Sequence, residues 1–310
     1  MSSAEVLDVM AVGVCGSDTQ RLRAGFDVRS LGHELVGRRP GDGTLTAIRP
    51  LNPCQVCLAC QRGWTEQCAS DVSIGRLDTG QGGFSGRVRA QPGQLYPIPA
   101  HLPLAVATLA DPLACIIHAF HGISLDGTNL LIIGDGPMAA VAAVHARQCA
   151  AWVSIAVKDD ARASRVSRFA DHVVTVEELP VTHYDVVLEA VGGISSAPIL
   201  TAILAVAPLG QVVALGVYRP DLAAVIPVRT LLEKESTLRG SKAYRVSAER
   251  DDFATALEHL TTCRDAYSPI ITRTPPWSPD DPQPPELERR NGTLKTVYVR
   301  GPAGPDDTRP

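Results

Sequence analysis

The pattern of apolar and polar positions changes in character along the chain. From Val6 to about Pro99, short apolar runs are interrupted by glycine, proline and cysteine, which is typical of irregular β structure with loops. From about Leu113, apolar strand-like runs such as Leu130–Ile133 and Asp185–Leu188 alternate with alanine-rich stretches of helical length. Such alternation is typical of a parallel, doubly wound sheet. We therefore predict an α/β protein with two domains.

The alternation stops after about Ser241. Residues 252–260 have amphipathic spacing and predict one helix ahead of a proline-rich loop. Residues 295–299 alternate as a strand does and are expected to return to the first region. We therefore expect three segments, which are a first domain of residues 1–112 completed by 242–300, a parallel-sheet domain of residues 113–241, and a disordered tail of residues 301–310.

Composition narrows the classes of partner. The 310 residues carry a net charge of −4 and form no basic stripe, so neither nucleic acid nor an anionic membrane is an expected partner. No apolar run approaches the length of a membrane span, and the first ten residues lack the basic region of a secretory signal. We expect a cytoplasmic protein whose partner is a small molecule.

Four of the eight cysteines are closely spaced, as Cys54-x2-Cys57-x2-Cys60-x7-Cys68. Zinc prefers tetrahedral sulfur, and a site filled by four protein thiolates leaves no position for substrate. The competing interpretation is a pair of local disulfides, which a cytoplasmic chain disfavours. The spacing therefore predicts a structural zinc ion.

A second set of metal-binding side chains is dispersed. It comprises Cys15 with Ser17 and Asp18, then His33 with Glu34, and then Asp111. One thiolate, one imidazole and one carboxylate are the mixed ligands that a catalytic zinc uses while keeping a fourth position open. Taken singly, each residue is more often an ordinary buried residue than a ligand.

A glycine-rich loop follows the apolar run 130–133 and opens an alanine-rich stretch. Its sequence is Gly134-Asp-Gly136-Pro137-Met138-Ala139, a Gly-x-Gly-x-x-Ala pattern. The first glycine permits a tight turn, and the second lets the backbone approach a pyrophosphate at a helix N-terminus. This loop predicts a dinucleotide site that includes Gly134, Gly136, Pro137 and Met138.

The residues at the end of the next predicted strand bear on whether the dinucleotide is NAD or NADP. The acidic residue that would hold the adenine ribose of NAD falls near Val157 or Lys158, and Asp159 comes slightly late. Lys158 and Arg162, with Arg165, could instead meet a 2′-phosphate, which favours NADP over NAD. A solvated basic helix face is an equally good interpretation of these residues.

The motifs occur in the order found in zinc-containing medium-chain dehydrogenases, and the chain resembles the polyol and sugar dehydrogenase branch of that family. The resemblance rests on Gly13–Asp18, Gly32–Glu34 and the four cysteines. It extends over nearly the whole chain through Gly82–Phe84, Asp111–Ala114, Glu189–Gly192, Leu209–Gly216 and Lys234–Gly240.

This resemblance implies a GroES-like catalytic domain and a Rossmann domain, with hydride transfer between a secondary alcohol and NAD(P). It implies that Cys15 and His33 are zinc ligands, that Ser17 binds the substrate oxygen and that Asp18 orients His33. Family members differ in whether the remaining ligand corresponds to Glu34 or to Asp111, and both stay candidates. The resemblance also places Ala190, Val191 and Gly216 at the cofactor, and it implies a homo-oligomer.

The chain departs from the family pattern in two places. It begins almost at the strand that leads to Cys15, and Gln20 stands where many relatives have a histidine that passes a proton to solvent. These departures suggest a cofactor-binding scaffold without turnover as an alternative function. The zinc-free reductase branch is disfavoured because it lacks both metal sets. The resemblance makes a hydroxyl group of a sugar, polyol or cyclitol the first expectation for the substrate, and either direction of the reaction stays open.

Overall fold

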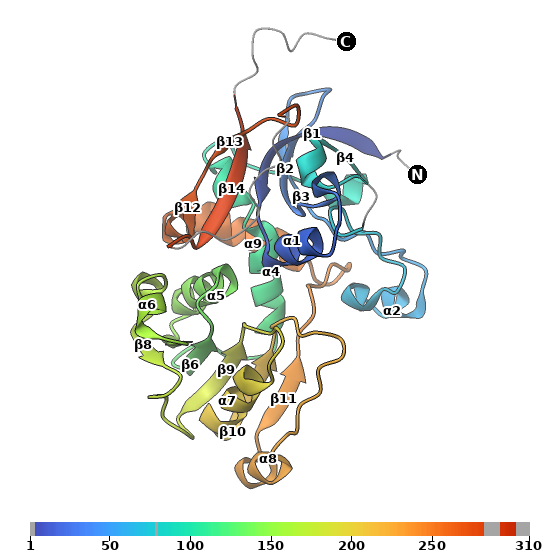
Figure 1. The fold of residues 1–310 in the computed structure, drawn as a ribbon. Coiled ribbons are helices and arrows are strands. Elements are labelled where there is room, and N and C mark those ends of the chain that lie inside the picture. Colours follow the sequence, from blue (N-terminus) through green and yellow to red (C-terminus); the bar gives the residue numbers. More distant parts are fainter. Residues whose placement is uncertain (1–3, 78–79, 282–291, 302–310) are drawn as a thin grey trace. The chain divides into compact units, whose positions relative to one another are not determined.

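The fold is that of a computed structural model that describes residues 4–77, 80–281 and 292–301. The described residues divide into two compact units, one formed by those up to 111 together with those from 245 on, and the other by residues 112–244 (Figure 1). The division made from the sequence placed the corresponding boundaries at 112/113 and 241/242. The predicted disordered tail, apart from Gly301, lies outside the described residues.

The first unit is built on an eight-stranded sheet with the order β12-β14-β1-β2-β3-β5, in which β4 also pairs with β1 and β13 with β14. Its strands are β1 (Glu5–Gly13), β2 (Glu34–Arg38), β3 (Leu45–Ile48), β4 (Arg87–Ala90), β5 (Leu95–Pro97), β12 (Ile271–Arg273), β13 (Pro276–Trp277) and β14 (Lys295–Arg300). Its helices are α1 (Gly16–Arg23), α2 (Leu58–Gln61), α3 (Leu104–Ala107), α9 (Asp252–Thr262) and α10 (Arg264–Tyr267), with 3-10 turns η1 (Val28–Ser30), η2 (Thr65–Gln67), η3 (Gly83–Ser85), η4 (Pro92–Gln94) and η6 (Ser268–Ile270).

Strand β1 organises this unit because it pairs antiparallel with β14, β2 and β4. The strand expected at residues 295–299 is therefore confirmed, and it returns to the first region as predicted. Apolar side chains of β1, such as Leu7 and Val9, pack with Phe84 and Tyr298 in one core cluster. This core fixes the ends of β1 and β2, where the candidate metal ligands begin.

The second unit is a six-stranded parallel sheet with the order β11-β10-β9-β6-β7-β8. Its strands are β6 (Asn129–Ile133), β7 (Trp152–Val157), β8 (His172–Thr175), β9 (Tyr184–Glu189), β10 (Val206–Ala214) and β11 (Thr237–Gly240). Its helices are α5 (Pro137–Gln148), α6 (Asp160–Ala163), α7 (Ala197–Ala205) and α8 (Val228–Lys234), with the 3-10 turn η5 (Ser167–Phe169). Helix α4 (Ala110–Ala119) spans the boundary between the units.

The doubly wound sheet predicted from the alternating pattern is confirmed. Strand order reverses between β6 and β9, because β7 and β8 lie on one side of β6 while β9, β10 and β11 lie on the other. In open parallel sheets a ligand binds beside the carboxyl ends of the strands at such a reversal. The strand order therefore predicts a ligand-binding position at the carboxyl end of β6.

Helix α5 packs closely on this sheet because its buried face consists of small residues. Residues 139–146 are all buried, and five of these eight are alanines. Across the part of the chain that is described, no helix is both long enough and apolar enough to span a bilayer.

Candidate functional site

The four closely spaced cysteines converge in the loop around α2. Their sulfur atoms all lie within 4.8 Å of one another, and the Sγ atoms of Cys57 and Cys68 are 3.9 Å apart. Four sulfurs bound tetrahedrally at about 2.3 Å from zinc would be separated by about 3.8 Å. All eight cysteines are free thiols, so the four form no disulfide. This geometry fits one zinc ion with four thiolate ligands.

Backbone groups prepare part of this site for a metal. The N–H of Cys57 donates to the sulfur of Cys54, and the N–H of Cys54 donates to the sulfur of Cys68, both at 3.4 Å. Hydrogen bonds from the N–H groups of Val56 and Cys57 lower the pKa of Cys54 to about 6, whereas burial raises the pKa of Cys60 to about 12. With the pKa of Cys60 raised, the four thiols do not all lose their protons at neutral pH by themselves. A bound zinc ion, which takes thiolate ligands, would bring about that deprotonation.

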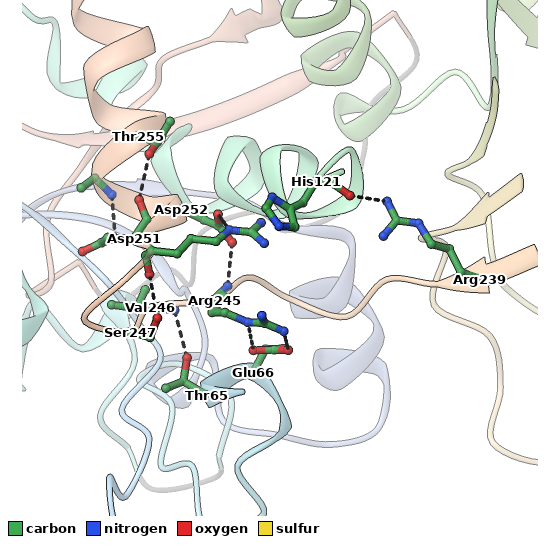
Figure 2. A network of polar contacts seen from close by, with 12 residues as sticks. Thr65, Glu66, His121, Arg239, Arg245, Val246, Ser247, Asp251, Asp252 and Thr255 are labelled. Carbon is green, nitrogen blue, oxygen red and sulfur yellow. Dashed lines mark hydrogen bonds and ion pairs between the residues drawn. The ribbon is translucent and has the colours of Figure 1, made fainter. Parts of the chain in front are cut away.

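A partly buried ion pair that the sequence did not reveal connects the cysteine loop to the segment before α9 (Figure 2). Arg245 donates from Nε and from its terminal nitrogen to the two carboxylate oxygens of Glu66, at 3.1 and 2.7 Å. One residue further, the N–H of Val246 donates to the hydroxyl of Thr65 at 2.9 Å. The two partners of each contact are about 180 positions apart, so no local sequence pattern predicts these contacts.

The second metal set gathers at the ends of β1 and β2. Cys15 is the residue before α1, and His33 immediately precedes β2, whose first residue Glu34 pairs with Gly13 of β1. One ligand atom each of Cys15, His33 and Glu34 lies within 4.8 Å of the others. Cys15 and His33 are 18 positions apart in sequence, and they meet because the end of β1 pairs antiparallel with the start of β2.

Asp18 fixes the position of His33. Its side chain is fully buried, and Oδ1 lies 3.2 Å from Nδ1 of His33 while it also accepts the N–H of Gly32 at 3.2 Å. The other oxygen, Oδ2, accepts the N–H of Cys15 at 2.9 Å. With Nδ1 on the carboxylate, Nε2 is left for a metal.

Asp111 also reaches this cluster. It lies in the first turn of α4, and its Oδ2 is 4.0 Å from Nε2 of His33. The three sequence motifs predicted to cooperate, at Cys15, His33 and Asp111, thus meet in one place. This arrangement can hold a metal ion with ligands of mixed type.

Buried charges are coupled across the cluster. Burial alone would lower the pKa of His33, but the negative charges of Asp18 and Cys15 raise it well above its usual value. Burial alone would raise the pKa of Cys15, but the charge of His33 and a hydrogen bond from it lower the pKa overall. The cluster therefore favours the thiolate form of Cys15, which is the form that binds metal.

Glu34 has a cationic partner that the sequence did not reveal. Lys295, at the start of β14, is buried and forms an ion pair with Glu34, and its Nζ also donates to the carbonyl of Val14 at 2.9 Å. Burial raises the pKa of Glu34, while Lys295 opposes that rise. A side chain at Gly13 would place Cβ 2.1 Å from Oε2 of Glu34, so only glycine leaves room for this carboxylate.

The other two residues of interest in this region lie on α1. Ser17 is on the first turn, two residues after Cys15, and is half-buried. Gln20 lies one turn further along the same helix and is exposed.

In the second unit, the glycine-rich loop lies between β6 and α5, as predicted. Gly134 has a φ of +132°, a conformation that favours glycine. Gly136 caps α5 without any side-chain hydrogen bond, and Pro137 occupies the first turn. The free N–H groups of that turn and the open space around Gly136 suit a bound pyrophosphate.

The basic residues after β7 have acidic partners. Arg165 contacts Asp135 of the glycine-rich loop at 2.7 Å, and Arg162 contacts Asp135 at 3.5 Å and Asp159 at 3.4 Å. Lys158 is exposed at the end of β7. Asp135 was not singled out from the sequence, although its place between two glycines marks it.

The remaining cofactor candidates lie at the carboxyl ends of β9 and β10. A Cβ on Gly134 would lie 3.2 Å from a methyl group of Val191 and 3.5 Å from the carbonyl oxygen of Ala190. The N–H of Gly216 donates to the carbonyl of Glu189 at 3.0 Å. Ala190 and Val191 therefore adjoin the glycine-rich loop, and Gly216 adjoins the end of β9.

Comparison with known proteins finds one matching domain family and several similar dehydrogenases. Residues 3–100 match the alcohol dehydrogenase GroES-like domain. The chain is 28% identical over 286 residues to L-idonate 5-dehydrogenase (NAD(P)(+)) of Escherichia coli K12, covering 84% of this chain and 81% of that protein. It is 31% identical over 150 residues to galactitol 1-phosphate 5-dehydrogenase of the same organism, covering 43% of this chain and 42% of that protein.

Solved structures share the fold. The structure of L-idonate 5-dehydrogenase from E. coli superposes with a TM-score of 0.79 at 23% identity, covering 96% of this chain and 91% of that chain. A protein described as a zinc-binding dehydrogenase, from Sinorhizobium meliloti and solved with NADP, superposes with a TM-score of 0.82 at 23% identity, covering 96% and 92% of the two chains. The chain therefore carries an alcohol dehydrogenase GroES-like domain in residues 3–100, and over most of its length it is similar to L-idonate 5-dehydrogenase.

Proposed function

We propose that this chain is an NAD(P)-dependent zinc dehydrogenase that oxidises a secondary hydroxyl group of a sugar, sugar acid or polyol to a ketone. The observation that carries this proposal is the buried cluster in which Cys15, His33 and a carboxylate converge while Asp18 holds the far nitrogen of the imidazole. A structural zinc site is usually filled by four protein ligands, whereas a catalytic site has three ligands of mixed type and one position left for substrate.

The catalytic ion would be held by Cys15 and His33 with Glu34 or Asp111, and the structural ion by Cys54, Cys57, Cys60 and Cys68. Zinc at the first site supplies Lewis acidity, which lowers the pKa of a substrate hydroxyl. Lys295 neutralises Glu34 when that carboxylate is not bound to metal, and Asp111 faces Nε2 of His33. Both carboxylates therefore remain candidates for the third ligand.

Oxidation of an alcohol removes a hydride from the carbinol carbon and a proton from the hydroxyl oxygen. A bound oxidised NAD(P) would supply the hydride acceptor, and Ser17 would receive the hydroxyl proton. Since the side chain of Gln20 does not titrate, water or the cofactor ribose must take the proton from Ser17.

The substrate class follows from the relatives. Three relatives at 26–28% identity over most of the chain are named as 5-dehydrogenases of L-idonate, L-galactonate and 2-dehydro-3-deoxy-L-galactonate. All three are sugar acids, so a secondary hydroxyl near the end of a sugar-acid chain is the first candidate here. Polyols and cyclitols are the next.

The cofactor is held by Gly134, Gly136, Pro137 and Met138 at its pyrophosphate and by Ala190, Val191 and Gly216 further along. Lys158 and Arg162 meet the adenosine half and favour NADP. Arg162 suits this role better than Arg165, because its contacts with Asp135 and Asp159 are long and its side chain is 41% exposed.

We also propose that the protein is cytoplasmic and forms a homo-oligomer through the Rossmann strands near Leu209–Val217. Leu209 and Val217 are 74% and 73% exposed, and β11 is an edge of the sheet beside β10. Large exposed apolar side chains beside a sheet edge suit burial against a second copy. Light scattering at micromolar concentration tests this point.

The activity itself is tested by assaying purified protein with NAD and with NADP against L-idonate, L-galactonate, galactitol 1-phosphate, sorbitol and myo-inositol. We expect reduction of one cofactor with at least one member of this panel, and no turnover with Cys15→Ala. Tight cofactor binding without turnover on the panel and in the reverse direction with the corresponding ketones would instead favour a cofactor-binding scaffold.

A further inference from the structure

The carboxyl end of β9 carries a buried acid to which the proposed mechanism gives no role. Glu189 is fully buried, and no cation is paired with it among the described residues. Its Oε1 accepts the N–H groups of Val191 and Gly192, at 2.7 and 2.8 Å. A carboxylate in such a place needs donors for both oxygens, because burying an unpaired charge is costly.

Glu189 also links two loops. Its carbonyl accepts the N–H groups of Leu215 and Gly216 at 2.9 and 3.0 Å, so its main chain holds the end of β10 while its side chain holds the turn after β9. The contact between the loops is tight, since a Cβ on Gly192, which has a φ of +63°, would lie 2.4 Å from the backbone of Val217.

Two buried oxygen atoms beside these loops are Oε2 of Glu189 and the phenol oxygen of Tyr218. Oε2 of Glu189 and the hydroxyl of Tyr218 are both buried, and neither makes a hydrogen bond of good geometry within the part of the chain that is described. Burial and the nearby charge of Glu189, to which the phenol is close enough to donate, raise the pKa of Tyr218. The phenol therefore stays protonated at neutral pH and is the natural donor to Oε2.

The topology assigns these loops to one half of the dinucleotide. The pyrophosphate loop follows β6, and the basic residues for the adenosine half follow β7 on one side of it. Strands β9 and β10 lie on the other side of β6. A dinucleotide that crosses the reversal point therefore lays its nicotinamide half over the loops that Glu189 and Tyr218 join.

We propose that Glu189 and Tyr218 act as a pair of positioning residues for the nicotinamide half of the cofactor. The pair rests on the proposed function, since it presumes an NAD(P) site. Tyr218 donates to Oε2, and Oε1 holds the turn at Val191 and Gly192, so that the loops after β9 and β10 keep one arrangement. Neither side chain needs to touch the reacting atoms.

Binding of three probes tests the proposal without relying on turnover. NADH, NADPH and ADP-ribose are titrated by calorimetry into wild type, Tyr218→Phe and Glu189→Gln. ADP-ribose lacks the nicotinamide ring, so it reports only on the pyrophosphate and adenosine half. Tyr184→Phe is the matched control, because its phenol is buried at the amino end of the same strand and bonds Ser154.

We expect Tyr218→Phe to weaken the preferred reduced cofactor by about three- to tenfold, the effect of one hydrogen bond, while ADP-ribose changes less than about twofold. Glu189→Gln should retain most of the affinity, because its amide oxygen still accepts the two backbone N–H groups and its NH2 can donate to Tyr218. Tyr184→Phe should bind all three probes as wild type does.

Two results would overturn the proposal. One is unchanged binding of the reduced cofactor by Tyr218→Phe, and the other is an equal loss of reduced cofactor and ADP-ribose, which would show a general structural role. If wild type binds ADP-ribose but neither NADH nor NADPH, the proposed function itself fails, and the pair has no nicotinamide to position.

Discussion

At the residue scale, the candidate catalytic cluster combines ligands that the sequence could predict with a partner that it could not. Cys15, Asp18 and His33 stand in short motifs whose residue types indicate metal chemistry, and they meet as expected. Lys295 could not be predicted, because its contact with Glu34 spans 261 positions and depends on β14 pairing with β1. Long-range strand pairing, and not a local pattern, creates that ion pair.

Replacing Asp18 tests the support of His33. Asp18→Asn keeps the shape of the side chain but removes the charge that stabilises the imidazole, so zinc affinity at the catalytic site should fall by about 10- to 100-fold. Competition with a fluorescent chelator measures this affinity. The zinc of the four cysteines serves as an internal control and should be retained; equal loss of both ions would indicate damage to the whole unit.

Removing Lys295 tests the buried ion pair. Lys295→Met leaves the carboxylate of Glu34 buried without its cation, and breaking such a pair costs about 3–5 kcal/mol of stability. Urea unfolding of the metal-free protein measures the loss. The double variant Lys295→Met with Glu34→Gln should be less destabilised than Lys295→Met alone, because no charge is then left unpaired; an additive loss would contradict this account.

Arg162 is the residue with which to test cofactor choice. If it contacts a 2′-phosphate, Arg162→Ala should weaken NADPH by about 10- to 100-fold, the range for a charge-assisted hydrogen bond, and NADH by less than about twofold. Fluorescence titration measures both. Arg168→Ala is a suitable control, since its guanidinium lies over Phe169 instead. Equal effects on the two cofactors would remove Arg162 from this role.

At the element scale, regular strands and helices could be predicted because their apolar spacing is local. The runs 130–133 and 185–188 lie within β6 and β9, and the predicted helix 252–260 lies within α9. The strand β13 within the proline-rich segment was not expected, because two residues, Pro276 and Trp277, carry no period. It forms through pairing with β14, which only the tertiary fold supplies.

The cysteine loop is the element whose order we expect to depend on bound zinc and on the ion pair between Arg245 and Glu66. Chelation of the structural zinc should raise amide hydrogen exchange in residues 52–72 by more than tenfold, while exchange in β1 and β6 changes little. Arg245→Met should produce a smaller rise in the same loop, because the ion pair between Arg245 and Glu66 is then lost. Cys263→Ser, at a half-buried cysteine outside the loop, should have no such effect.

At the scale of the whole molecule, metal and dinucleotide are assigned to different compact units. Both metal clusters lie in the first unit, and the glycine-rich loop lies in the second. Cys15→Ala should therefore abolish turnover yet bind NADH or NADPH within about threefold of wild type in a fluorescence titration. Loss of cofactor binding together with turnover would contradict this division of roles.

The most direct test for two zinc sites is the zinc content of the intact chain, measured by mass spectrometry of metals on protein purified without chelator. We predict two zinc ions per chain in wild type and one in Cys15→Ala, with the remaining ion held by the four cysteines. A single ion in wild type that survives Cys15→Ala would contradict this prediction, because the cluster at Cys15 and His33 would then hold no metal.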